Sequence, residues 1–331
     1  KTSMFITQKY TELLKKYPHN RIIILSHTNV AADEIRDEIL KLPEVKEKGL
    51  TKKSFKYKIG TIHSYCKSRV LNRDVFDYED HINLCRNPDH GSNFKLQRIS
   101  ENEFEANQHK FYKYLSDAFG KGMTLEEHWK TCERSEYKPY SLNIIKEMQD
   151  KYEKYKKDPK TLCCDFKDMI KDFIHKANDP DIDALIVDEA QDSNIPQKRA
   201  LDKMATNTKE YWFVGDPDQT IFEFAGASAE TFYKLSKGAK EIEQGHRCGQ
   251  TINNLCKQII KPIWDHYGTH RTWRPANYPE GHEKEGQLII GNHYHLPNYT
   301  TDCSHLRILL DKIRNTEETF LFTYRNNSSK K

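Results

Sequence analysis

The chain has 331 residues, of which 36% are hydrophobic and 31% are charged, with 53 Lys and Arg against 49 Asp and Glu. No hydrophobic run approaches the roughly 20 residues that a membrane-spanning helix needs, so we exclude a transmembrane protein and expect no membrane partner. Aromatic residues make up 11% of the chain, enough to build a core, which argues against disorder. The length predicts about two or three domains.

Eight cysteines at irregular spacings, with no secretory segment, indicate reduced thiols in a cytoplasmic (nucleoid) or nuclear protein that is not secreted. The adjacent Cys163 and Cys164 indicate packing rather than chemistry. His81, Cys85 and His90 raise the alternative of a zinc site, which we do not favour because no second Cys/His pair has a recognised spacing. The chain begins at Lys1, so we expect it to be part of a longer protein.

The first 70 residues are strongly basic, with 15 Lys and Arg against 7 Asp and Glu. Hydrophobic spacing predicts a helix over residues 5–14, a buried parallel strand over 21–25 and a helix over 29–40. Just before Ile59, an extended strand would place Lys56 and Lys58 on one face, which suits a phosphate backbone. A solvated lysine-rich loop is the equally acceptable alternative.

Residues 71–178 are polar and mostly helical in pattern, and we interpret them as a helical insertion in the sheet domain. One helical stripe within them is hydrophobic and is expected to pack in a core. Its members are Ile144, Ile145, Met148, Tyr152 and Tyr155.

Two short hydrophobic runs, 184–187 and 211–214, are predicted strands that each end in an acidic turn. Strands that alternate with helices predict an α/β parallel sheet whose ligands bind at the carboxyl ends of the strands. Asp188 could there hold Mg²⁺ beside a nucleotide, and Glu189 could polarise a water. In the second turn Gly215 permits a tight turn, and the Gln219 amide could sense a phosphate. An ordinary capped strand–turn–helix is the alternative to both sites.

Six segments in order resemble the motifs of UvrD/Rep/PcrA-like superfamily 1A DNA helicases. They are Leu-Ser-His-Thr-Asn-Val-Ala-Ala at 25–32, Gly-Thr-Ile-His-Ser at 60–64, Asp-Phe-Lys-Asp-Met at 165–169, Val-Asp-Glu-Ala-Gln-Asp at 187–192, Val-Gly-Asp-Pro-Asp-Gln-Thr-Ile at 214–221 and Gln-Gly-His-Arg-Cys at 244–248. Residues 319–325 resemble a core strand of the family's second domain, with less specificity.

This resemblance implies a RecA-like parallel-sheet P-loop NTPase core with a helical inserted subdomain and the start of a second RecA-like domain. The implied boundaries are 1–70 and 179–240 for ATPase domain 1A, 71–178 for subdomain 1B, and 241–331 for a partial domain 2A. The family's motifs V and VI lie beyond the segments matched, so we expect this portion to be inactive alone.

The resemblance also implies roles in ATP hydrolysis. Asp188 would bind Mg²⁺, Glu189 would activate the attacking water, Gln219 would contact the γ-phosphate, and Arg247 would be the arginine finger. Lys1 and Thr2 stand where the family has its Walker A Lys and Thr. Lys1 would then neutralise the phosphates and the Thr2 hydroxyl would join the Mg²⁺ ligands.

Nucleic-acid contacts are implied for seven residues near the strand ends. They are His27, Thr28, Asn29, Thr61, His63, Phe222 and Phe224. The two phenylalanines replace the Tyr and Trp on which the family stacks bases. The chain departs from the family at Val30 (usually Lys), at Ala225 (usually Arg) and at residues 245–246, which puts the strength of DNA contact in question.

The implied function is an ATP- and Mg²⁺-dependent 3′→5′ DNA helicase or single-stranded DNA translocase. Its expected partners are single-stranded DNA or 3′-tailed duplex DNA, with a nuclease or a replication or repair protein as a further possibility. The alternative is an ATP-gated nucleic-acid-binding or regulatory subunit that does not unwind. DNA versus RNA preference, the pathway and the oligomeric state stay open.

Overall fold

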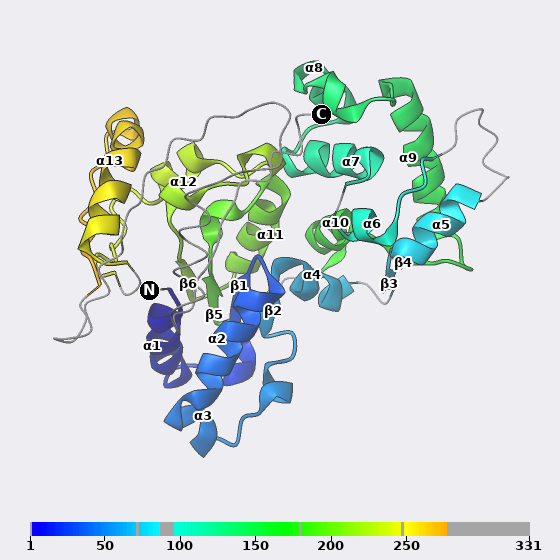
Figure 1. The fold of residues 1–331 in the computed structure, drawn as a ribbon. Helices are drawn as coiled ribbons and strands as arrows, with labels where there is room; N and C mark the ends of the chain where they lie inside the picture. The colour runs from blue at the N-terminus through cyan, green and yellow to red at the C-terminus, as the bar shows by residue number, and fades with distance from the viewer. Residues whose placement is uncertain are drawn as a thin grey trace, which may run out of the picture. The chain divides into compact units, whose positions relative to one another are not determined.

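The computed structural model describes residues 2–70, 73–86, 96–106, 108–178, 180–245 and 248–276, whose fold is drawn in Figure 1. The chain divides into two compact units. The first comprises the described residues within Lys1–Gln244 and Ile260–Thr272, and the second those within Gly245–Ile259 and Trp273–Lys331. Both candidate chemical turns belong to the first unit.

Four parallel strands form the central sheet of the first unit in the order β2-β1-β5-β6. Their bounds are Ile22–Ser26 for β1, Ile59–Thr61 for β2, Ala184–Val187 for β5 and Glu210–Phe213 for β6. Ile24 pairs with Ile59 on one side and with Ile186 on the other. The predicted α/β parallel sheet is confirmed.

Helices cover both faces of this sheet (Figure 1). On one face lie α1 (Thr2–Leu14), α2 (Asn29–Lys41) and α3 (Pro43–Glu47), with the short η1 (His19–Arg21) and η2 (Lys52–Phe55) between elements. On the other lie α4 (Ile62–Val70), α10 (Phe166–Lys176), α11 (Ile195–Ala205) and α12 (Ala229–Leu235).

Alternation along the strands divides the core into two layers. Ile22 and Ile24 pack with α1 and α2, whereas Ile23 and Leu25 pack with α4 and α10. This alternation follows from the two-residue period of a strand, and burial on both faces explains why β1 is hydrophobic throughout.

A helical layer with its own core stands beside the sheet. Its helices are α5 (Tyr78–Arg86), α6 (Glu101–Glu105), α7 (Lys110–Gly120), α8 (Leu125–Thr131), η4 (Arg134–Tyr137) and α9 (Leu142–Lys157). Two short strands, β3 (Asp74–Val75) and β4 (Cys163–Cys164), pair in parallel beside them. The predicted stripe on α9 is confirmed, since Ile145, Met148, Tyr152 and Tyr155 are buried in this core.

Helix α10 falls within the predicted insertion of residues 71–178, but its side chains belong to the core of the sheet. Met169, Ile170 and Phe173 pack with α4 and α11 beneath Leu185 of β5. The helical layer and the sheet therefore meet at the start of α10.

The lysine-rich segment before β2 does not form the predicted extended strand. Residues Lys52–Phe55 are a 3₁₀ helix, and Tyr57 has a left-handed backbone with φ of 61°. The segment precedes β2, so it lies at the amino edge of the sheet, opposite the carboxyl ends where parallel sheets bind ligands. The prediction of one shared lysine face is wrong, because the 3₁₀ helix ends the alternation.

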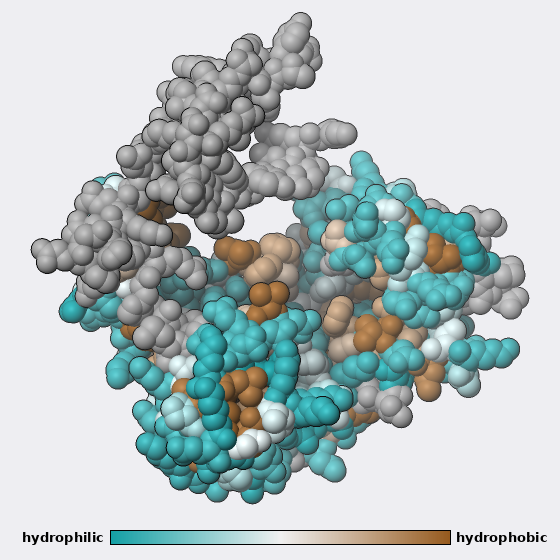
Figure 2. Space-filling model, turned by 60° about the horizontal axis from the view of Figure 1, so that its bottom comes forward, coloured by the Kyte–Doolittle hydropathy of each residue, from teal (hydrophilic) through white to brown (hydrophobic). Residues whose placement is uncertain are grey.

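The face in Figure 2 is mostly hydrophilic, with small hydrophobic patches, as expected of a chain rich in charged residues. Among the residues that the structure describes, no helix combines the length and the apolar character required to cross a bilayer.

Candidate active site

The carboxyl end of β5 carries an acidic pair. Asp188 continues the sheet, because its amide donates to the carbonyl of Leu25 at 2.8 Å, and the residue is only 4% exposed. Burial and the neighbouring charge of Glu189 raise the pKa of Asp188 to about 6. Its Oδ1 atom is buried and has no hydrogen-bond partner within the described part of the chain. A buried carboxylate oxygen without a partner fits a divalent cation, for which Mg²⁺ is the ion that takes oxygen ligands.

Glu189 adopts a left-handed backbone, with φ of 51° and ψ of 39°. The amide of Ala190 donates to the carbonyl of Val214 at 3.0 Å, and this bond to the next strand end holds the turn in place. A non-glycine residue in this region costs roughly 1–2 kcal/mol. Glu189 is the N-cap residue of the 3₁₀ helix η5 (Ala190–Asp192), which follows it directly.

A buried glutamine joins the two acidic turns. Gln191 donates from Nε2 to Glu189 Oε2 at 2.8 Å and accepts at Oε1 from the amide of Asp216 at 3.1 Å. Asp216 in turn accepts at Oδ2 from Gln219 Nε2 at 2.8 Å. Glu189 and Gln219 are therefore ends of one hydrogen-bonded chain that spans the ends of β5 and β6.

Gly215 has a different role from the one that the sequence suggested. Its backbone is not left-handed, but a Cβ at this position would collide with Gln191 Oε1. Glycine is therefore required here because the buried amide of Gln191 passes over its backbone, and the expected need for a tight turn is not the reason.

Three predicted nucleotide contacts cannot be placed. Lys1 and Arg247 lie outside the described residues, as does the segment 319–325. Thr2 is the first residue of α1, and its side chain also lies outside the description.

The end of β1 presents the first group of predicted nucleic-acid contacts. His27 is half-buried, and its Nε2 lies 3.1 Å from Ser193 Oγ. Burial, with the nearby charge of His63, lowers the pKa of His27 to about 4. Thr28 caps α2 by accepting from the amide of Ala31, which leaves its hydroxyl proton free to donate. Asn29 is exposed beside it.

The end of β2 presents the second group. Thr61 Oγ1 accepts from the amide of Ser64, so this hydroxyl also caps a helix. His63 packs edge-on against Phe166, with ring centroids 5.2 Å apart, and burial lowers its pKa to about 4. Phe166 is 62% exposed, and its position beside His63 is a feature that sequence reasoning missed.

The loop after Gln219 exposes three large hydrophobic side chains in succession. Ile221 is 71% exposed, Phe222 42% and Phe224 61%, and the two phenylalanine rings lie 5.9 Å apart. Exposed aromatic rings on a loop beside a polar site are suited to stacking with bases.

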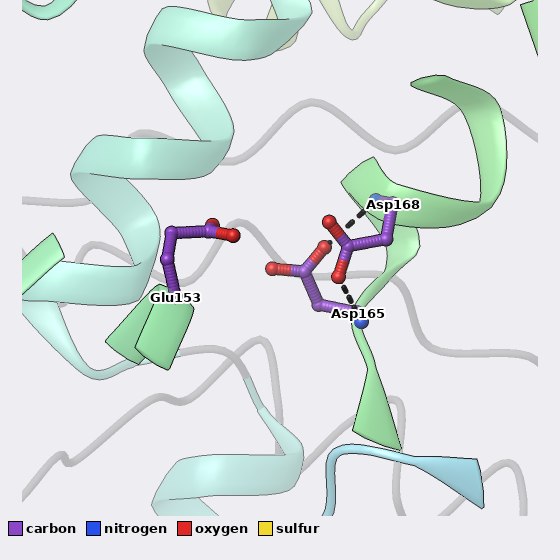
Figure 3. Close-up of side chains that lie close together, drawn as sticks. All are labelled: Glu153, Asp165 and Asp168. Carbon is purple, nitrogen blue, oxygen red and sulfur yellow. Dashed lines mark hydrogen bonds between the residues drawn. The ribbon is translucent and has the colours of Figure 1, made fainter. Parts of the chain in front are cut away.

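The sequence motif at 165–169 has a structural function. Figure 3 shows Glu153 of α9 facing Asp165 and Asp168 at the start of α10, a grouping that resembles a metal site. Lys156 Nζ, however, lies 3.0 Å from Asp165, 2.7 Å from Asp168 and 3.0 Å from Glu153. Its side chain is 1% exposed, so an ammonium already occupies the space among the three carboxylates and leaves no place for a metal.

The disfavoured zinc alternative also gains no support. His90 lies outside the described residues, and His81 is fully buried, with Nδ1 3.1 Å from the Tyr112 hydroxyl. Cys85 Sγ lies 3.7 Å from His81 Nε2, a contact between neighbours on one helix. Burial lowers the pKa of His81 to about 4 and raises that of Cys85 to about 11, as expected for core side chains.

Comparison with known proteins agrees with this geometry. The model of the UvrD/REP helicase N-terminal domain matches residues 1–240. A probable DNA helicase II homolog of Mycoplasma capricolum is 24% identical over 279 residues, 77% of this chain and 37% of that protein. Its counterpart from Mycoplasma genitalium is 26% identical over 78% of this chain and 39% of that protein.

The ATP-dependent DNA helicase PcrA of Staphylococcus aureus is 26% identical over 266 residues, 74% of this chain and 34% of PcrA. The chain thus spans well under half the length of the curated relatives that it matches. Because the family model covers most of its residues, the chain belongs to the UvrD/REP helicase family, through that family's N-terminal domain.

Proposed function

We propose that this chain is the ATP-hydrolysing portion of a 3′→5′ DNA helicase or single-stranded DNA translocase. One observation carries the proposal: the buried amide of Gln191 links Glu189 to Asp216 and Gln219 across two strand ends. A pure binding module has no need of a carboxylate at one end of such a chain and a phosphate-sensing amide at the other.

The residues divide the chemistry between them. Asp188, with its unpartnered oxygen, would hold Mg²⁺, which when bound neutralises charge on the phosphates. Glu189 accepts a proton from the attacking water, and Gln191 keeps its carboxylate oriented. Gln219 donates to the terminal phosphate. Lys1, Thr2 and Arg247 complete the site in this proposal, at positions implied by the family motifs.

Single-stranded DNA would run over the same edge of the sheet. Phe222, Phe224 and Phe166 offer exposed rings for bases, and the capping hydroxyls of Thr28 and Thr61 offer donors for phosphates. His27, His63 and Asn29 add neutral polar contacts. Backbone contacts and stacking would give a grip that tolerates any sequence.

The test is DNA-stimulated ATP hydrolysis by the complete polypeptide that contains this chain. Glu189→Gln keeps the side chain's shape and should reduce turnover by about 10²- to 10⁴-fold while leaving the dissociation constant for ATP nearly unchanged. Glu230→Gln is the matched control, since Glu230 is exposed on α12 and forms an ion pair with Lys234. Unchanged turnover in Glu189→Gln would remove this residue from the mechanism.

A binding or regulatory module is the second candidate, favoured by one observation. Val30, at the position where the family has a lysine, is 80% exposed beside Thr28 and Asn29, so a charge that would grip phosphate is absent there. Displacement of streptavidin from one end of a single strand separates the candidates. ATP-dependent displacement from the 5′ end supports a 3′→5′ motor, and nucleotide-dependent binding without turnover supports the module.

A further inference from the structure

The loop that carries Gln219 contains a carboxylate that the proposed chemistry does not use. The side chain of Asp218 is only 2% exposed. A buried carboxylate is stable only where hydrogen bonds and positive charge compensate its lost hydration. The partners of Asp218 therefore reveal what holds this loop.

Those partners come largely from a distant part of the sequence. Oδ1 accepts from the Tyr233 hydroxyl, and Oδ2 accepts from Trp264 Nε1 at 2.9 Å. Arg271 Nη1 lies 3.8 Å from the same Oδ2. Trp264 lies in α13 (Gln250–Tyr267), and Arg271 follows that helix.

The same arginine also holds the residue that binds Gln219. Arg271 Nη1 donates to Asp216 Oδ1 at 2.9 Å, while the other oxygen of Asp216 accepts from Gln219 Nε2 at 2.8 Å. Tyr267 adds a stacked contact with Tyr233, with centroids 4.2 Å apart and planes at 20°. We name Trp264, Tyr267 and Arg271 the loop clamp.

The amide nitrogen of Gln219 carries two protons. In this structure one of them is donated to Asp216, whose position Arg271 sets, so Asp216 orients the amide and thereby the proton that is left for a phosphate oxygen. Phe222 and Phe224 follow three and five residues later, so the amide that would meet a phosphate and the two exposed rings lie on one short loop.

We propose that the loop clamp positions Gln219 and thereby makes the grip on single-stranded DNA depend on the bound nucleotide. The inference rests on the proposed function, because it requires that Gln219 meets a phosphate. Arg271 and Trp264 act through Asp216 and Asp218, so they are positioning residues.

The experiment compares the full chain with Arg271→Gln, Arg271→Lys and the control Lys261→Gln. Lys261 is exposed on α13 and pairs with Asp265 at 2.7 Å, so the control removes one positive charge from the same segment without touching the loop. For each protein we would measure the dissociation constant of an oligo(dT) strand with and without a non-hydrolysable ATP analogue and Mg²⁺. Hydrogen exchange of residues 215–221 supplies a second readout that needs no ligand.

We expect the wild-type chain and Lys261→Gln to show the same several-fold ratio between the two DNA dissociation constants. Arg271→Gln should bring this ratio close to one and speed exchange of the loop by about tenfold, with the affinity for each ligand alone changed less than about threefold. Arg271→Lys should restore part of the ratio.

A ratio in Arg271→Gln equal to that of the wild type, despite faster exchange, would show that the clamp is structural only and would overturn the inference. A wild-type chain that binds both ligands independently would also overturn it, while leaving the proposed ligands in place. A wild-type chain that binds neither ligand would overturn the proposed function, and the inference with it.

Discussion

At the scale of single residues, the acidic turn after β5 gives two adjacent carboxylates different surroundings. Asp188 is buried with an unpartnered oxygen, whereas Glu189 has the amide of Gln191 as its partner. The first arrangement suits a bound cation, and the second suits a base held in one orientation.

The raised pKa of Asp188 predicts a pH-dependent affinity for magnesium nucleotide. Protonation as the pH falls through about 6 removes the charge that would bind the cation, so affinity should be full above pH 7 and fall about tenfold per unit below pH 6. Calorimetric titration of Mg²⁺ and an ATP analogue from pH 5 to 8 measures this.

The pKa of Asp192 is also raised to about 6, by burial and by the charge of Glu189. The experiment must therefore show which of the two aspartates causes the pH dependence. Asp192→Asn should keep the pH dependence, and Asp188→Asn should remove it together with most of the affinity. The opposite pattern would assign the cation to Asp192.

A second prediction concerns Gly215. Gly215→Ala places a methyl group against Gln191 Oε1 and should destabilise the chain by about 1–3 kcal/mol. Adding Gln191→Ala should recover part of that loss, because the collision is removed, and urea unfolding of the four proteins gives the coupling. Strict additivity of the two changes would show that the side chain of Gln191 is not what requires glycine at 215.

At the scale of secondary-structure elements, a single lysine joins α9 to α10. Burial alone would lower the pKa of Lys156, but Asp165, Asp168 and Glu153 together raise it above the usual range, so the ammonium keeps its charge. Asp165 and Asp168 also form the capping box of α10. This lysine therefore fixes the helix start that presents Phe166.

Lys156→Met should destabilise the chain by about 3 kcal/mol, because it removes a buried ammonium from three half-buried carboxylates, of which Asp165 keeps only Lys167 at 3.5 Å. Lys157→Met, at an exposed position of the same helix, should change stability by less than about 0.5 kcal/mol. Thermal and urea unfolding measure both. Equal stability of the two variants would mean that the cluster is solvated or rearranges.

The hydrophobic pattern predicted β1 and β5 because these two central strands are buried on both faces. The run at 184–187 matches β5, and the predicted turn at Asp188 lies where β5 ends. Lys156 could not be identified in the same way, since a lysine among exposed lysines on α9 shows no pattern until Asp165 and Asp168 fold against it. Gln191 was likewise part of a recognised motif, but its bridge needs the pairing of β5 with β6.

At the scale of the whole molecule, buried histidines determine the response to acid. Burial holds the pKa of His27, His63 and His81 at about 4, below the value of about 6.5 expected in the unfolded chain. Each therefore contributes stability that is fully present above pH 6.5 and is lost as the pH falls toward 4. Asp188 and Asp192 have the opposite sign, because the folded state binds their protons first.

The histidines whose pKa burial lowers, which also include His109 and His128, outnumber the three aspartates whose pKa is raised, Asp168, Asp188 and Asp192, so the free energy of unfolding should be lower at pH 5 than at pH 7. Urea unfolding at the two pH values measures the net change in the free energy of unfolding. NMR titration of the imidazole carbons measures the pKa of each histidine. A midpoint that rises toward pH 5, or imidazoles that titrate near 6.5, would contradict the burial of these rings.

The left-handed backbone at Glu189 has a consequence for attempts to improve this protein. Asparagine tolerates that conformation better than glutamate, so Glu189→Asn would relieve local strain while discarding the proposed base. Directed evolution of this chain for heat resistance alone would then favour inert variants at this codon, and a library selected for both traits should retain the glutamate.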